Sequence, residues 1–466
     1  MGAVEDDATS EGAAERGWGS GAALLAIGRA STLVLQAAQL ALVARLLSPV
    51  QFGSWAAATA LVMVASAVAD CGLGPTAVIY LASRAGCLDD IVAANAVALL
   101  GATLLTCVAS IAFGASAALA TLSLVPWLVI VRLQAPSISA LQQRFRFRRI
   151  VAGDVIGTSV QTVMLVGLLL AAGTTGQTVR VLLIGACLAM GGVVELKVVV
   201  IARLWPSRSC LRRRAWLGLL GSAASLGVVN GVSMLHSRVD QLILALLVSR
   251  ATLGGYAVAY RVVDATVALA SVASRAGFSV LVNRREEARA LVTRGLVRTW
   301  AVVGMGAGLG VWLGAPMLMN VVGGGGYPAA PGLLRILAPI VAVAAINNAA
   351  GQALVADGAT RFLLKISLIG LAANAVLCLT LIPELGAPGA GAASLITESF
   401  GMLMVVGRAR RPGVRRGGLG PRRDRGTTPT GSHDGAPAQP PERRGSMGHT
   451  SDPLPQRQVE VAGTRE

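Results

Sequence analysis

Twelve apolar runs, each 18 residues or longer, constrain this chain more than any other sequence feature. They lie at roughly 21–44, 54–80, 91–113, 116–138, 151–172, 181–202, 217–247, 254–281, 299–319, 332–355, 366–383 and 388–407. Each run is long enough to cross the hydrocarbon core of a bilayer as a helix. Because backbone groups in hydrocarbon need partners within the segment, and no alternating pattern favours a barrel, the sequence predicts an all-α polytopic membrane protein.

The composition argues against several other classes of protein. Hydrophobic residues make up 54% of the chain and charged residues 14%, whereas a soluble domain carries about 25% charged residues. The net charge of +17 lies mostly in connections and in the C-terminal segment, so we expect no nucleic-acid partner. The six cysteines form no C-x-x-C pair, which predicts reduced packing residues and no metal site. With no Gly-x-x-x-x-Gly-Lys motif and one histidine before residue 408, the chain is expected to be a transporter without a cofactor, not an enzyme.

Lysine and arginine are unevenly divided between alternate connections of the predicted spans. One set of connections holds eighteen, grouped mainly at 144–149, 203–214 and 284–298, and the other set holds three, Arg45, Arg180 and Arg250. Basic connections stay on the cytoplasmic side of a membrane. We therefore expect a multi-pass protein of the cytoplasmic (inner or plasma) membrane with both termini in the cytoplasm.

The basic segments also suggest how the chain is divided. We expect a cytoplasmic N-terminal segment (1–20), an N-terminal six-helix lobe (21–202), a basic cytoplasmic linker (203–216), a C-terminal six-helix lobe (217–407) and a disordered basic cytoplasmic tail (408–466). The arginines of the tail would attract anionic membrane lipids.

An internal repeat supports this division into two lobes. A shift of 201 residues places the run 46–58 on the run 247–259, so that Ser48 matches Ser249 and Gly53 matches Gly254. Six predicted spans separate the copies. The halves should therefore have the same topology and be related by an axis along the membrane normal.

Short motifs occur in an order that resembles one known family. Residues 44–74 read ARLLSPVQFGSWAAATALVMVASAVADCGLG, and QQRFRFRR (142–149), VDQLI (239–243), LGGYAVAYR (253–261), ADGATR (356–361) and IPELGAPGAG (382–391) follow. These resemble the polysaccharide-export branch of the MOP superfamily, the Wzx-type oligosaccharide and lipopolysaccharide flippases, although Gln241 and Cys71 depart from its pattern. The resemblance implies a V-shaped, MATE-like pair of six-helix bundles that flips a polyprenyl-diphosphate-linked oligosaccharide by alternating access. It also implies partners among other polysaccharide-assembly proteins.

Charged residues within the predicted spans are the candidate functional residues, because a charge at mid-bilayer costs at least about 2.5–3.5 kcal/mol. Arginine can bind phosphate oxygens through charge-assisted hydrogen bonds. The candidates to bind the diphosphate of the substrate are Arg29, Arg132, Arg238, Arg261 and Arg275. Alternatively, some of these arginines extend to the membrane interface or form internal ion pairs.

The candidate ion-coupling residues are the acids of the spans and a single histidine, namely Asp70, His236, Asp240, Asp264 and Glu398. Arg261 and Asp264 are three residues apart, and His236 and Asp240 are four apart on the preceding span, so each pair shares a helical face. A carboxylate beside an imidazole favours coupling to H⁺ or Na⁺. A structural ion-pair lock between the two spans fits the same residues.

Two other transport functions fit the sequence. One is a lipid II-type flippase for cell-wall synthesis. The other is a cation- or proton-coupled drug antiporter of the same superfamily, for which carboxylates in an otherwise uncharged cleft would be typical. The arginines in both predicted lobes argue against the antiporter.

Overall fold

The computed structural model is helical, and no strand occurs in the part of the chain that it describes. That part comprises residues 27–83, 87–171, 173, 175–201, 204–282, 286–356 and 359–409, with the backbone alone at 213, 272–282, 286–291, 356 and 360. The predicted all-α class is confirmed. The predicted segment 1–20 and all but two residues of the predicted tail lie outside the described residues.

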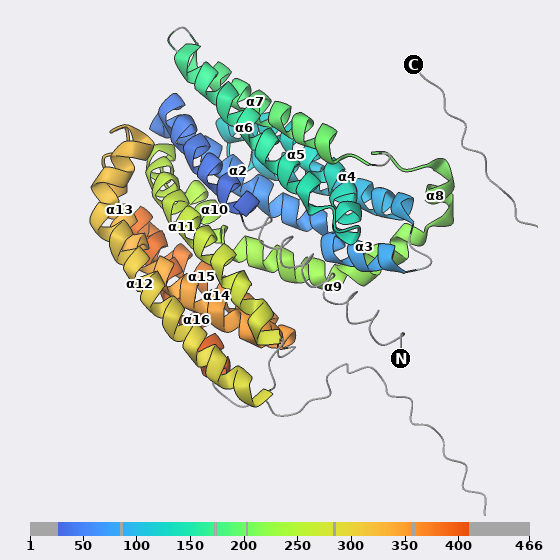
Figure 1. Ribbon diagram of the computed structural model, residues 1–466. Coiled ribbons are helices and arrows are strands. Elements are labelled where there is room, and N and C mark those ends of the chain that lie inside the picture. Colours follow the sequence, from blue (N-terminus) through green and yellow to red (C-terminus); the bar gives the residue numbers. More distant parts are fainter. Residues whose placement is uncertain are drawn as a thin grey trace, which may run out of the picture. The chain divides into compact units, whose positions relative to one another are not determined.

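The helices follow one another with short connections (Figure 1). The first helix, Ile27–Leu46, is followed by α2 (Pro49–Asp70), α3 (Leu73–Ala82), α4 (Leu88–Ile111), α5 (Ala115–Gln143), α6 (Phe147–Ala171) and α7 (Gln177–Val199). Then come α8 (Arg208–Arg213), α9 (Ala215–His236), α10 (Val239–Leu247), α11 (Arg250–Val282), α12 (Glu286–Gly323), α13 (Ala330–Leu337), α14 (Pro339–Ala356), α15 (Thr360–Leu385) and α16 (Ala387–Ala409).

Nearly every predicted span coincides with a helix of membrane-spanning length. Among the described residues, 11 segments are long and apolar enough to cross a membrane. The remaining predicted span, 254–281, lies in α11, which is 33 residues long and carries Arg261 and Asp264 near its centre. These two charges lower the hydropathy of a helix that is otherwise long enough to span. The chain is a multi-pass membrane protein.

Three predicted spans are interrupted in the structure. Cys71 and Gly72 adopt left-handed conformations, with φ of 44° and 72°, and separate α2 from α3. A side chain at Gly72 would also meet the Ala223 carbonyl oxygen of α9 at 2.5 Å, so this break requires glycine. Ser237 and Arg238 separate α9 from α10, and Ala338 separates α13 from α14. The apolar runs predicted each of these spans as one continuous segment, although Asp70 and Pro339 fit a bend in the first and third of them.

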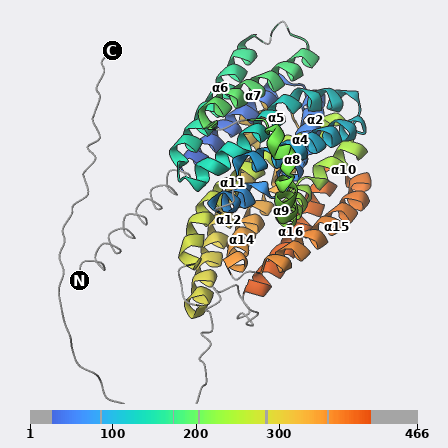
Figure 2. The ribbon, with the colours of Figure 1, turned by 90° about the vertical axis from the view of Figure 1, so that its right-hand side faces the viewer.

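Two groups of helices pack among themselves and meet through a few elements. The first contains α2 and α4 to α7, and the second contains α10 to α16. Both views place α6 and α7 side by side and away from α12 and α14 (Figure 2). Helix α9 contacts α2 and α4 as well as α15, and α2 packs directly on α11. The lobe boundaries proposed above, 21–202 and 217–407, stay predictions.

The two copies of the repeat have the same local structure. The Ser48 hydroxyl accepts a hydrogen bond from the Gln51 backbone N–H at 3.4 Å, and the Ser249 hydroxyl accepts one from the Thr252 N–H at 3.2 Å. Each serine thus caps the helix that follows it.

The matched glycines of the two copies lie against each other where α2 crosses α11. A Cβ atom at Gly53 would collide with the Arg250 carbonyl oxygen, and one at Gly254 would collide with the Pro49 carbonyl oxygen. Only residues without a side chain let the two backbones come this close. We call this contact the glycine crossing.

Arginines beside the glycine crossing donate to backbone carbonyl groups. Arg45 donates to the Val321 carbonyl at 2.5 Å, and Arg250 donates to the carbonyls of Phe113 and, at 2.7 Å, Ala245. The bonds to Val321 and Phe113 join segments more than 130 residues apart. They therefore connect the first helix to α12, and α11 to the segment between α4 and α5.

The segment between α7 and α9 is attached to the N-terminal end of α4. Ser207 donates to the Asp89 carboxylate at 3.3 Å, and the Cys210 thiol donates to the Asp90 carboxylate at 3.1 Å. Burial and the Asp90 carboxylate raise the pKa of Cys210 to about 12, so this cysteine is a protonated packing residue. All six cysteines are free; Cys187, Cys210 and Cys378 are buried, whereas Cys87 is exposed and does not fit the predicted packing role.

Candidate functional site

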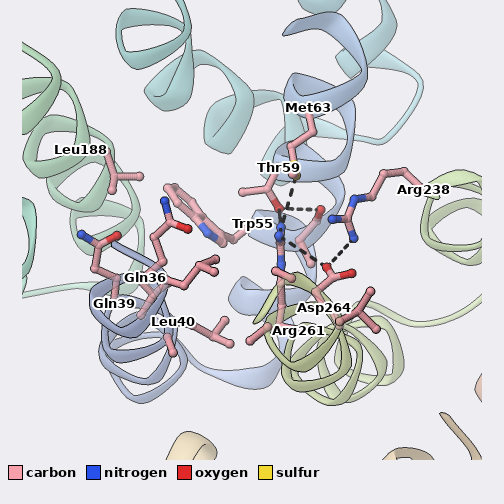
Figure 3. Close-up of a pocket in the computed structure, with 18 of the residues that line it drawn as sticks. Gln36, Gln39, Leu40, Trp55, Thr59, Met63, Leu188, Arg238, Arg261 and Asp264 are labelled. Atoms are coloured by element: carbon pink, nitrogen blue, oxygen red, sulfur yellow. Dashed lines mark hydrogen bonds and ion pairs between the residues drawn. The ribbon is translucent and has the colours of Figure 1, made fainter. Parts of the chain in front are cut away.

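A cavity of about 450 Å³ lies between the first helix, α2, α7 and α11 (Figure 3). The first helix contributes Arg29, Gln36 and Gln39 to its lining, and α2 contributes Trp55 and Thr59. Gln39 is fixed by hydrogen bonds to the Thr158 carbonyl at 3.0 Å and to Gln161 at 3.2 Å, both on α6. We call this space the central cavity.

Three of the predicted substrate-binding arginines line the central cavity, and a single carboxylate faces them. These arginines are Arg29 from the first helix, Arg238 from the break between α9 and α10, and Arg261 from α11. Asp264 lies 2.8 Å from Arg238 and 3.9 Å from Arg261. Arg29 forms no ion pair with any residue that the structure describes. The lining therefore carries an excess of positive charge.

Arg261 links the two groups of helices through contacts that the sequence did not predict. It donates to the Thr59 hydroxyl at 3.2 Å and to the Met63 sulfur at 3.7 Å, both on α2 (Figure 3). Its guanidinium group is thereby held at the wall of the cavity, with 24% of the side chain exposed. In the sequence, the feature that could have indicated this contact is the polar residue Thr59 within an apolar run.

Arg238 is the most enclosed cation of the cavity. Its side chain is 7% exposed, and its guanidinium carbon lies 5.8 Å from the centre of the Tyr260 ring. Its close partner is Asp264 of α11. Arg238 and Asp264 therefore form an ion pair between the seventh and eighth predicted spans. The sequence had instead suggested Arg261 as the nearer partner of Asp264.

Arg132 and Asp70 face a second cavity, of about 540 Å³, between α2, α5 and α9. Their side chains form an ion pair at 3.0 Å. Asn95 of α4 accepts from Arg132 at 3.2 Å and donates to the Arg132 backbone carbonyl at 2.8 Å, so this arginine is held on both sides. Met63 lines both cavities.

His236 and Asp240 have separate partners instead of each other. His236 pairs with Glu398 of α16 at 3.3 Å. The Asp240 carboxylate is 1% exposed and accepts from the Tyr256 hydroxyl at 2.5 Å and from Ser394 at 3.2 Å. The break at Ser237 and Arg238 removes the helical spacing that suggested a shared face. Arg275 lies in α11 with its side chain outside the described residues.

Comparisons with known proteins assign the family. The family model described as "Polysaccharide biosynthesis protein" matches residues 19–281, more than half of the chain, so the protein belongs to this family. This confirms the resemblance to the polysaccharide branch of the MOP superfamily. No curated protein matches the sequence.

Solved structures of flippases and transporters share the fold. The chain aligns with the lipid II flippase MurJ in its inward closed conformation, with a TM-score of 0.69, 14% identity, and 83% of this chain and 87% of that chain covered. An inward-facing multidrug resistance MATE family transporter of the MOP superfamily gives a TM-score of 0.62 at 13% identity, covering 82% and 98%. The eukaryotic MATE transporter AtDTX14 gives 0.52 at 15% identity, covering 84% and 96%. At these identities the similarity shows a common fold.

Proposed function

We propose that this protein moves an oligosaccharide linked to polyprenyl diphosphate, a precursor of polysaccharide or lipopolysaccharide, across the cytoplasmic membrane by alternating access. One observation carries the proposal: three arginines and one carboxylate line the central cavity. A diphosphate is a compact, multiply charged anion, and guanidinium groups bind its oxygens through paired, charge-assisted hydrogen bonds. The distribution of lysine and arginine supports cytoplasmic termini.

In this proposal Asp264 is the counter-ion of the cavity arginines before the substrate binds. It is shared between Arg238 and Arg261 at 2.8 and 3.9 Å. An entering diphosphate replaces Asp264 at one or both arginines, and Arg29 adds a third guanidinium group. The arrangement keeps the arginines charged and oriented before the substrate arrives.

Alternating access requires that the substrate contact both groups of helices. Arg29 belongs to the first helix and Arg261 to α11, so a diphosphate bound by both would join them. Arg261 already makes this link through Thr59. We propose that the substrate takes over this contact as the cavity closes around it.

Ion coupling, where it occurs, would use the remaining acids. Asp240 is enclosed by Tyr256 and Ser394, and His236 faces Glu398 across α9 and α16. Asp240, or the pair of His236 and Glu398, could take up H⁺ or Na⁺. Asp70 and Asp264 are paired with arginines instead. If the rate of substrate translocation did not depend on pH or on a sodium gradient, Asp240, His236 and Glu398 would have purely structural roles.

A lipid II-type flippase is the second candidate, favoured by the similarity to the lipid II flippase structure. Its substrate also carries a polyprenyl diphosphate, so the arginines of the central cavity would serve it equally. A drug antiporter is disfavoured, because a cationic drug would be repelled by three arginines.

Deletion of the gene tests the proposed function. We expect a polyprenyl-diphosphate-linked glycan to accumulate in the inner leaflet, and its sugars identify the substrate. Complementation with Arg261→Gln should fail to clear it, whereas Arg335→Gln should succeed, because Arg335 is exposed, lies over the Trp312 ring and does not line the central cavity. Loss of resistance to cationic dyes, without a glycan, would instead support the antiporter.

A further inference from the structure

A third cavity, formed by helices of the C-terminal half, has the chemistry of a lipid site. It encloses about 750 Å³ between α12, α14 and α16. Arg294 and Arg298 line it from α12, one helical turn apart and both exposed. Buried Thr293 adds a hydroxyl group to the same lining. No aspartate or glutamate occurs among the described residues that line it.

The rest of this lining is apolar. Ile346 comes from α14, and Met402, Leu403 and Val406 come from α16. Leu403 is 61% exposed, so the apolar wall continues onto the outer surface of a helix of membrane-spanning length. An occupant must therefore carry negative charge at one end and hydrocarbon at the other.

The end of the helices at which the cavity lies agrees with this chemistry. Arg294 is near the start of α12, and Val406 is near the end of α16. The arginine distribution assigns this end to the cytoplasmic side. The cytoplasmic leaflet is the one rich in anionic lipids, which attract arginine near the surface.

We propose that this cavity binds an anionic phospholipid of the cytoplasmic leaflet. Its phosphate lies between Arg294 and Arg298, and an acyl chain lies along Met402, Leu403 and Val406. The lipid joins α12 to α16 within the C-terminal half. No residue lines both this cavity and the central cavity, so the inference does not depend on the proposed substrate.

Native mass spectrometry of the full chain, titrated with phosphatidylglycerol or phosphatidylcholine in a neutral detergent, tests the assignment. The wild type should retain one phosphatidylglycerol well above the phosphatidylcholine background. Arg294→Gln with Arg298→Gln should weaken that binding by at least about fivefold. The matched control is Arg146→Gln with Arg148→Gln, which removes two exposed arginines near the start of α6 and should leave binding unchanged.

Three results would overturn the proposal. Equal losses in the two double variants would mean general attraction to basic surface. Displacement of phosphatidylglycerol by glycerol phosphate at equal concentration would mean a site for free phosphate without a role for the acyl chain. Retention of a polyprenyl phosphate, with no preference for phosphatidylglycerol, would make the cavity a substrate portal. Each variant is also compared with the wild type by its melting temperature, so a folding defect is recognised separately.

Discussion

The arginines beside the glycine crossing and those of the central cavity differ in what they contact. Arg45 and Arg250 donate to the backbone carbonyl groups of Val321 and Phe113, which belong to the fold itself. Arg238 and Arg261 share the single carboxylate of Asp264, which a competing anion can displace. An arginine in an apolar body is therefore structural or functional according to its partner, not according to its burial.

The largest expected effect on stability comes from the arginines beside the glycine crossing. Arg250→Gln removes charge-assisted bonds to Phe113 and Ala245, which should lower the free energy of unfolding by about 1.5–3 kcal/mol. Thermal unfolding in detergent measures this loss. Arg335→Gln is the matched control, because it removes an exposed arginine that lies over the Trp312 ring and forms no hydrogen bond or ion pair with a described residue. Equal melting temperatures for the two variants would refute the structural role of Arg250.

The glycine crossing itself should be nearly as sensitive. Gly254→Ala places a methyl group against the Pro49 carbonyl and should cost about 1–3 kcal/mol through overpacking. At neighbouring Gly255 the nearest atom to an added Cβ is Leu333 Cδ1 at 4.0 Å, so Gly255→Ala should be tolerated. If the two variants unfold at the same temperature, α2 and α11 do not pack as described.

A smaller effect is expected where the two groups of helices meet inside the cavity. Thr59→Val keeps the shape of the side chain and removes the hydrogen bond to Arg261, which should cost about 0.5–1.5 kcal/mol. Thr106→Val is a suitable comparison, because Thr106, like Thr59, donates to a carbonyl of its own helix but forms no hydrogen bond to a described residue of another helix. A loss confined to Thr59→Val would show that the contact between α2 and α11 contributes to stability.

The smallest effect on stability should come from the cavity arginine without a described ion-pair partner. Arg29→Gln should change the free energy of unfolding by less than about 0.5 kcal/mol, as at a surface position. Glycan export should nevertheless fall, because one of three guanidinium groups is lost. Normal export by a stably folded Arg29→Gln variant would contradict the proposed role of this residue.

The sequence predicted the helices better than their interruptions. Length and apolar composition located the spans, because a bilayer imposes both. The break at Cys71 and Gly72 depends on contact with α9, and the break at Arg238 depends on a carboxylate of α11. Such contacts are made between distant segments and leave no periodic signal.

The sequence predicted the residues of the candidate site better than their partners, because the partners come from distant segments. The free-energy cost of a charge within the membrane identified Arg29, Arg238 and Arg261 as candidates, and the structure brings these three residues to one cavity. Helical spacing suggested that His236 faces Asp240, but their partners, Glu398 and Tyr256, come from other helices. Residue spacing brought together Arg261 and Asp264 of α11, whereas the other described ion pairs, Arg132–Asp70, His236–Glu398 and Arg238–Asp264, join segments far apart in the sequence.

Binding of a polyprenyl-diphosphate-linked glycan by the purified protein tests the central claim most directly. Arg261→Gln leaves Asp264 paired with Arg238, so the fold should persist while one charge-assisted contact to the diphosphate is lost. We predict that affinity falls roughly tenfold to 150-fold, with little change for Arg335→Gln. Unchanged affinity in a folded Arg261→Gln variant would contradict the assignment of the central cavity to the diphosphate.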